Sequence, residues 1–149
     1  MTPDLSQVGP GFTDPSFGSQ AVFRSCLEAL AHPGTIVEVA SDAEAPAGLD
    51  AASNAVLLAL LDQDTALWMS PSIQPMSAVA YLRFHTGCIV VAEPALADFA
   101  VARGVDAAAL LAEVCRGSED YPDRSATLVV QVAGLCDTGG WTLSGPGIP

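Results

Sequence analysis

The 149-residue chain contains no lysine. Its five basic residues are all arginines, against 17 aspartates and glutamates, so the formal net charge is −12. Without lysine there can be no Schiff base that holds pyridoxal phosphate, and no lysine-containing phosphate-binding loop. So acidic a surface repels nucleic acid and anionic membranes, and no basic stripe offsets the charge. The sequence therefore predicts neither a nucleic-acid partner nor a membrane partner.

Cysteines are few and scattered, with no C-x-x-C pair, so no metal site and no cofactor are expected. Each lies in an apolar stretch and is predicted to be a buried free thiol: Cys26, Cys88, Cys115 and Cys136. Long apolar runs are also missing, because the longest, Ala55–Leu61, is far too short to cross a bilayer. The first 20 residues lack the basic and apolar regions of a signal peptide, which favours a cytoplasmic location.

Half of the residues are hydrophobic, enough for one ordinary domain with a real core. Residues 1–18, rich in Gly, Pro, Ser and Asp, predict an extended arm, and residues 19–149 predict a single domain. The first helix is expected to begin at an N-cap, Ser19, to bury Val22, Cys26, Leu27 and Leu30, and to stop at His32-Pro33-Gly34. Further helices are expected over 51–61, 75–85 and 106–115, the last capped by Asp106.

Strand patterns alternate with these helices, over residues 35–39, 66–69, 88–92, 99–102, 125–133 and 141–144. The run at 88–92 has no polar face, which is typical of a strand covered on both sides. This alternation predicts an α/β fold, a three-layer α/β/α sandwich. The last two strands are joined by Gly139-Gly140, a hairpin signal, so a mixed sheet is expected.

The densest polar cluster is at the junction of the third helix and the following strand, where Arg83, His85 and Thr86 lie close in sequence. Arg83 could grip a phosphate or carboxylate, and His85 could act as an acid or base. Asp64, one of two neighbouring carboxylates, is the fourth candidate ligand-binding residue. The alternative is structural: Arg83 and His85 complement the dipole at the end of the helix. The carboxylates would then cap a solvated turn, with Asp64 accepting a loop N–H or pairing with Arg83.

No arrangement for nucleophilic catalysis is evident, so no catalytic residue is predicted. The chain has two histidines, His32 and His85, and no G-x-S-x-G motif. His32, before Pro-Gly, is most simply interpreted as the end of the first helix.

Several segments together resemble the PhnH family, subunits of the bacterial carbon–phosphorus lyase system. The Arg-Phe-His-Thr string and the Ser-Gly-x-Gly-Ile end are the most specific of them. The segments are Phe23-Arg24, His32-Pro33-Gly34, Ser53–Leu58, Asp64-Thr65, Trp68, Leu82–Thr86, Ala126–Leu128 and Leu143–Ile148.

The resemblance implies a fold similar to the large domain of pyridoxal-phosphate-dependent transferases, without that cofactor. It implies a homodimer when isolated and, in the cell, partnership with the PhnG, PhnI and PhnJ subunits. That complex supports transfer of alkylphosphonate to the ribose of a purine nucleoside triphosphate. Members of the family usually continue past the Gly-x-Gly-Ile string, so C-terminal sequence beyond Pro149 is expected to be missing.

Two functions follow from these observations. The first is an accessory, non-catalytic subunit of the phosphonate-processing complex. The alternative is a stand-alone protein or small enzyme that binds a phosphonate or a nucleotide through Arg83, His85 and Asp64. An exposed Arg–phosphate contact at 4 Å is worth only about 1 kcal/mol in water, so such a site needs burial or several donors.

Overall fold

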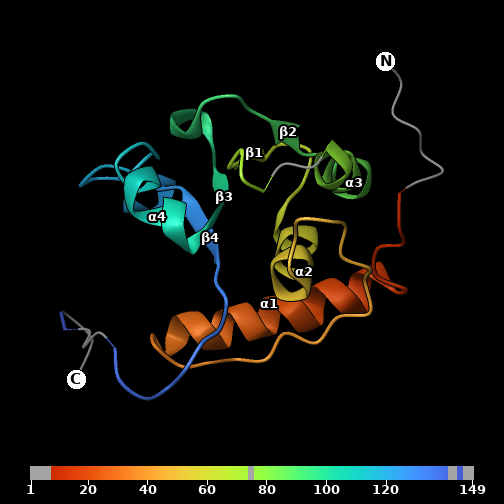
Figure 1. Ribbon diagram of the computed structural model, residues 1–149, viewed down its shortest axis with the longest axis horizontal. Helices are drawn as coiled ribbons and strands as arrows, with labels where there is room; N and C mark the ends of the chain where they lie inside the picture. Colours follow the sequence, from red (N-terminus) through yellow and green to blue (C-terminus); the bar gives the residue numbers. More distant parts are fainter. Residues whose placement is uncertain (1–7, 74–75, 141–143, 146–149) are drawn as a thin grey trace.

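The computed structural model describes residues 8–73, 76–140 and 144–145. A parallel sheet of four strands, in the order β2-β1-β3-β4, lies at its centre (Figure 1). The strands are β1 (Ala66–Met69), β2 (Ile89–Val90), β3 (Phe99–Arg103) and β4 (Thr127–Gln131). The helices are α1 (Pro15–Ala31), α2 (Ala51–Leu60), α3 (Met76–Thr86) and α4 (Gly104–Leu110), with short 3-10 turns η2 (Pro94–Leu96) and η3 (Pro122–Arg124). The predicted α/β class is confirmed.

The two faces of the sheet carry separate cores, because side chains alternate along each strand. On one face, Leu67, Met69 and Val101 pack with buried residues of α2 and α3. On the other face, Ala100 and Ala102 pack with residues of α4 and the turn after it. Figure 1 shows the strands between α4 on one side and α2 and α3 on the other. Helices therefore cover both faces of the sheet, as predicted.

The mixed character expected of the sheet rested on an antiparallel strand over 141–144. Residues 141–143 lie outside the described part of the chain, and the four strands within it pair only in parallel. The predicted strand at 88–92 shrinks to Ile89–Val90 at the edge of the sheet. Its Ile89 side chain is 53% exposed, so the prediction of a strand covered on both faces is wrong.

Helix α1 packs on α2, away from the sheet (Figure 1). The helix begins at Pro15, and its N-cap is Asp14 rather than the predicted Ser19. The Asp14 carboxylate accepts the backbone N–H groups of Ser16 and Phe17, at 3.0 and 3.1 Å. Pro15 occupies the first turn, where its missing N–H costs nothing. The arm thus ends near residue 14, and the helix ends at His32 as predicted.

The predicted inward face of α1 is only partly correct. Val22 is fully buried, whereas Leu27 and Leu30 are 50% and 77% exposed. The predicted strand at 35–39 is absent, and this segment runs irregularly beside α1, where Ser25 Oγ donates to the carbonyl oxygen of Glu38 at 3.3 Å. A strand needs a neighbour for its backbone N–H and C=O groups, and none of the described strands reaches it.

All four cysteines are free thiols, as predicted, but only part of the burial prediction holds. Cys88 is buried and Cys26 is half-buried, and burial raises the pKa of both thiols. Cys115 and Cys136 are exposed, because the segments that carry them lie in loops outside the two cores. None of the helices in the described part of the chain is long and apolar enough to span a membrane.

Candidate functional site

The turn between α2 and β1 is organised by Asp62 rather than Asp64. The Asp62 carboxylate accepts a hydrogen bond from the Thr65 hydroxyl and, at 3.0 Å, one from the Asp64 backbone N–H. The backbone N–H of Asp62 in turn donates to the Thr65 hydroxyl oxygen at 2.8 Å. The Thr65 hydroxyl and then the Asp64 N–H hold the pKa of Asp62 below its usual value. The capped-turn interpretation is therefore confirmed, but Asp62 is the acceptor.

Arg83 and Thr86 lie on the last turn of α3, near this capped turn. The Thr86 hydroxyl donates to the Leu82 carbonyl oxygen at 2.7 Å and accepts the Cys88 backbone N–H at 3.2 Å. Thr86 thus closes the end of the helix. Both Arg83 and Asp64 are exposed, and within the described residues no ion pair joins them. The predicted pairing of Asp64 with Arg83 is wrong.

His85 fastens the end of the N-terminal arm to α3. Its Nε2 atom lies 3.0 Å from the carbonyl oxygen of Gly9, and its ring lies 4.4 Å from that of Tyr81, between ring centres. A Cβ atom at Gly11 would fall 2.9 Å from His85 Nδ1, so the arm passes very close to the imidazole. Tyr81 strengthens the attachment, because its hydroxyl donates to the Pro10 carbonyl oxygen at 3.1 Å.

The four predicted ligand-binding residues are thus split between two places. Asp64, Arg83 and Thr86 lie where β1 and β2 begin, and β2 is bonded to this turn through the Ile89 N–H and the Thr65 carbonyl oxygen at 2.9 Å. His85 contacts the arm instead. In open parallel sheets, ligands bind outside the opposite end, the carboxyl ends of the strands.

The carboxyl edge has its own polar cluster, at the point where the strand order reverses. From β1 the chain passes through α3 to β2 on one side, and from β3 it passes through α4 to β4 on the other. Right-handed crossovers in opposite directions place their helices on opposite faces, which is where α3 and α4 lie. The crevice at such a switch point, here between β1 and β3, is the usual ligand site of this class of sheet.

Two serines and one carboxylate join the segments that follow β1 and β3 at this point. Ser70 and Ser72, directly after β1, both donate to Asp106 Oδ2, at 3.2 and 2.7 Å, and their hydroxyl oxygens lie 2.9 Å apart. Asp106 belongs to the first turn of α4, whose N-cap is Arg103, so the prediction that Asp106 is the N-cap is wrong. The carboxylate instead ties the loop after β1 to the helix after β3.

Beside this cluster, a cleft of about 700 Å³ lies over the carboxyl ends of β3 and β4. Gln131 forms part of its wall and is held on both sides, accepting the Asp50 N–H at 2.7 Å and donating to the Gly48 carbonyl oxygen at 3.0 Å. Arg103 is the only cationic side chain among the residues lining the cleft, and Asp50 lines it as well. One arginine beside an aspartate is a weak anion site.

Neither histidine is hydrogen-bonded to a serine, threonine or cysteine side chain in the described part of the chain. His32 contacts Glu28, the carboxylate at 3.1 Å and the carbonyl oxygen at 3.3 Å, in the last turn of α1. The Ser70–Asp106 cluster therefore has carboxylate and hydroxyls but no imidazole to act as a base. The described residues also include no group of three or more metal-ligating side chains.

Comparison with known proteins identifies the family of the chain. A family model described as "Bacterial phosphonate metabolism protein (PhnH)" matches residues 10–149. A protein of Rhizobium meliloti (strain 1021), "Alpha-D-ribose 1-methylphosphonate 5-triphosphate synthase subunit PhnH", is 44% identical over 152 aligned positions. The match covers 96% of this chain and 72% of that relative.

The chain belongs to the PhnH family. The segment matched by the PhnH model includes the predicted residues Asp64, Arg83, His85 and Thr86 together with both edges of the sheet.

The polar residues at the carboxyl edge were missed by sequence reasoning, although a signal was there. Ser70 follows a buried strand directly, and Arg103 ends another, so each marks a point where an apolar run turns polar. Such positions in parallel sheets meet at one edge.

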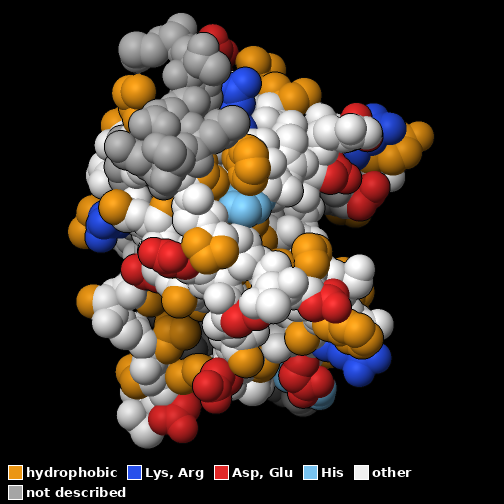
Figure 2. Space-filling model, turned by 90° about the vertical axis from the view of Figure 1, so that its right-hand side faces the viewer, with side chains coloured by type: hydrophobic (Ala, Val, Ile, Leu, Met, Phe, Trp, Pro, Cys, Tyr) orange, Lys and Arg blue, Asp and Glu red, His pale blue; other side chains and the backbone are white. Residues whose placement is uncertain are grey.

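Figure 2, viewed from the side of α3, shows basic side chains lying singly rather than as a patch. This agrees with the sequence of this PhnH-family chain, which has five arginines, no lysine and a net charge of −12.

Proposed function

We propose that this chain is an accessory, non-catalytic subunit of an α-D-ribose 1-methylphosphonate 5-triphosphate synthase. The observation that carries the proposal is the 44% identity to a synthase subunit over 96% of the chain. The resemblance names PhnG, PhnI and PhnJ as the other subunits, and the complex would join alkylphosphonate to the ribose of a purine nucleoside triphosphate in the cytoplasm.

The test is co-expression of the chain with PhnG, PhnI and PhnJ, followed by purification through a tag on PhnI. We expect the chain to co-purify in a fixed ratio to the other subunits. Synthase activity, followed as release of the purine base, should fall when this chain alone is omitted. A complex that assembles fully and never contains this chain would contradict the proposal.

The resemblance adds two finer expectations. One is that the isolated chain forms a homodimer, which light scattering would report as a mass of about 30 kDa, twice the 15.2 kDa of the chain. The other is likeness of the sheet to the large domain of pyridoxal-phosphate-dependent transferases, without the cofactor.

A further inference from the structure

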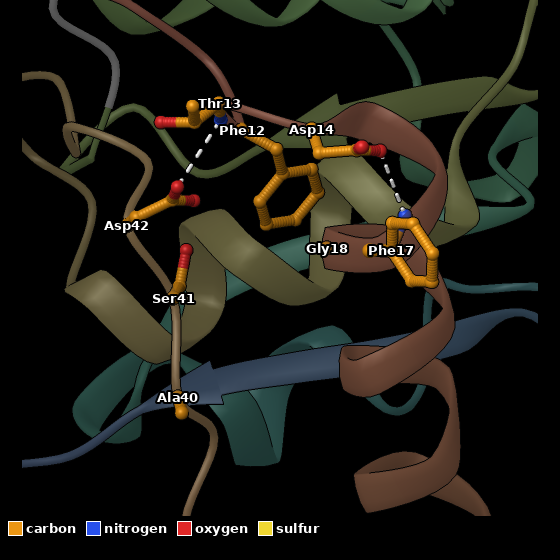
Figure 3. Close-up of a pocket in the computed structure, with 8 residues that line it drawn as sticks. All are labelled: Phe12, Thr13, Asp14, Phe17, Gly18, Ala40, Ser41 and Asp42. Carbon is orange, nitrogen blue, oxygen red and sulfur yellow. Dashed lines mark hydrogen bonds between the residues drawn. The ribbon is translucent and has the colours of Figure 1, made fainter.

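A cavity of about 550 Å³ opens between the first turn of α1 and the loop at 40–42 (Figure 3). None of the residues that line it belongs to the polar clusters described above. In Figure 3 the Phe12 ring lies in the middle of this space, with the loop on one side and α1 on the other. The lining residues are Phe12, Thr13, Asp14, Phe17, Gly18, Ala40, Ser41 and Asp42.

Two aromatic rings give the cavity its apolar character. Phe12 packs so closely on Gly18 that a Cβ atom there would lie 2.6 Å from a ring carbon, so the glycine makes room for the ring. Phe17 is 74% exposed, although it lines the same cavity. Exposed aromatic side chains are enriched where proteins meet, because they bury a large area at small entropic cost.

Two carboxylates lie on opposite sides of the Phe12 ring (Figure 3). Asp14 is held by the first N–H groups of α1, and Asp42 Oδ2 accepts the Thr13 backbone N–H at 3.2 Å. Hydrogen bonding from Thr13, through its side chain first, lowers the pKa of Asp42, so this group stays ionised in mildly acidic solution. Across the described residues neither carboxylate forms an ion pair. The cavity therefore combines aromatic surface with two carboxylates that are hydrogen-bonded to backbone N–H groups but have no cationic partner among the described residues.

We propose that this cavity receives an arginine or lysine side chain from another subunit of the synthase. The methylene stem would pack on Phe12 and Phe17, and the charged end would reach Asp42 and Asp14. A second copy of this chain fits less well, because five arginines are all the cationic side chains, apart from its two histidines, that it could offer against 17 carboxylates. The inference rests on the proposed function, since the partner is a synthase subunit.

The test uses two variants that leave the N-cap Asp14 untouched. Asp42→Asn keeps the shape and an acceptor for the Thr13 N–H but removes the charge, and Phe17→Ala removes an exposed ring. Each should weaken binding to the assembled remaining subunits by about tenfold or more, measured by biolayer interferometry. Asp42→Asn should also reduce the salt dependence of binding. Asp120→Asn and Leu111→Ala, an exposed charge and an exposed apolar side chain elsewhere, serve as matched controls and should bind within about twofold of the wild type.

Circular dichroism and thermal melts would establish that each variant is folded, and Asp42→Glu, which keeps the charge, should bind better than Asp42→Asn. Wild-type binding that neither variant weakens would overturn the inference and leave the proposed function intact. Failure of the wild type to join the complex would overturn both. Loss of self-association in Phe17→Ala, seen by light scattering, with unchanged binding to the other subunits would assign the cavity to a homodimer and also overturn the inference.

Discussion

At the scale of single residues, two members of the Arg-Phe-His-Thr string of α3, His85 and Thr86, form hydrogen bonds within the fold. His85 and Tyr81, one turn apart on the helix, bond the carbonyl oxygens of Gly9 and Pro10, and Thr86 closes the helix end. Tyr81 is fully buried and also accepts a hydrogen bond from the buried Asn54 at 3.5 Å. A distinctive string of polar residues can thus serve to attach an arm, which a sequence alone does not distinguish from ligand binding.

Replacing Tyr81 with phenylalanine should measure how much this attachment is worth. The variant loses the bond to Pro10 and the acceptor for Asn54, and should lower the free energy of unfolding by about 1 kcal/mol. Urea denaturation followed by circular dichroism would give the value. Tyr121→Phe, at the other tyrosine, is the control: it keeps the ring that Arg124 contacts and should change stability by less than about 0.5 kcal/mol. Equal losses in the two variants would contradict the assignment.

Asp62 should give stability a dependence on pH. Its folded-state pKa lies below the ordinary value, chiefly because of the Thr65 hydroxyl. The stability that ionised Asp62 contributes is therefore fully present above the pKa of this carboxyl in the unfolded chain, near 4. It is lost as the pH falls through the lower pKa of the folded protein. Asp62→Asn should be less stable than the wild type at neutral pH, and the difference should shrink below about pH 4. Urea unfolding at both pH values checks this, with Asp64→Asn as the control for net charge. A difference that is constant with pH would refute it.

The choice between Asp62 and Asp64 marks a limit of prediction at this scale. The pattern Asp-Gln-Asp-Thr predicted a capped turn, and the structure confirms one. Which carboxylate accepts depends on the direction of the chain leaving α2, and the sequence pattern does not fix it. Asp106 is a similar case: it was recognised as a residue of the α4 start, but its serine partners lie 34 and 36 residues away.

At the scale of elements, the start of α1 tests two alternative caps directly. Asp14→Ala should cost about 1 kcal/mol of unfolding free energy, because two N–H groups of the first turn lose their acceptor. Ser19→Ala should be close to neutral, because Ser19 lies inside the helix, where alanine is favourable. Paired urea titrations of the two variants decide the matter. A larger loss in Ser19→Ala would restore the later start predicted from the pattern.

Central elements were predicted well and peripheral ones poorly, for a physical reason. The strand Ala66–Met69 and the helix at residue 51 onward were located nearly to the residue, because buried elements need unbroken apolar patterns. The segment at 35–39 has an equally good strand pattern but no neighbouring strand. Strand formation depends on partners distant in sequence, so local pattern overestimates it.

At the scale of the whole molecule, strand order decides where a site can lie. The order β2-β1-β3-β4 puts the switch point between β1 and β3, with Ser70, Ser72 and Asp106 across it. The residues singled out from sequence, Asp64 and Arg83, lie at the other end of the strands. Strand order arises from non-local pairing, so a linear pattern predicts polar strand ends without saying which edge they share.

The final prediction separates an accessory role from independent ligand binding. Titration calorimetry of the isolated chain with methylphosphonate and with ATP should show no heat, because a net charge of −12 opposes anions and no two arginines converge in the described cavities. Arg83→Ala should leave this unchanged. Heat lost in Arg83→Ala but kept in Arg103→Ala would instead support the stand-alone alternative, whereas the reverse pattern would place a ligand at the carboxyl edge. Both arginines are exposed, so either variant should fold normally. Each variant therefore serves as the control for the other.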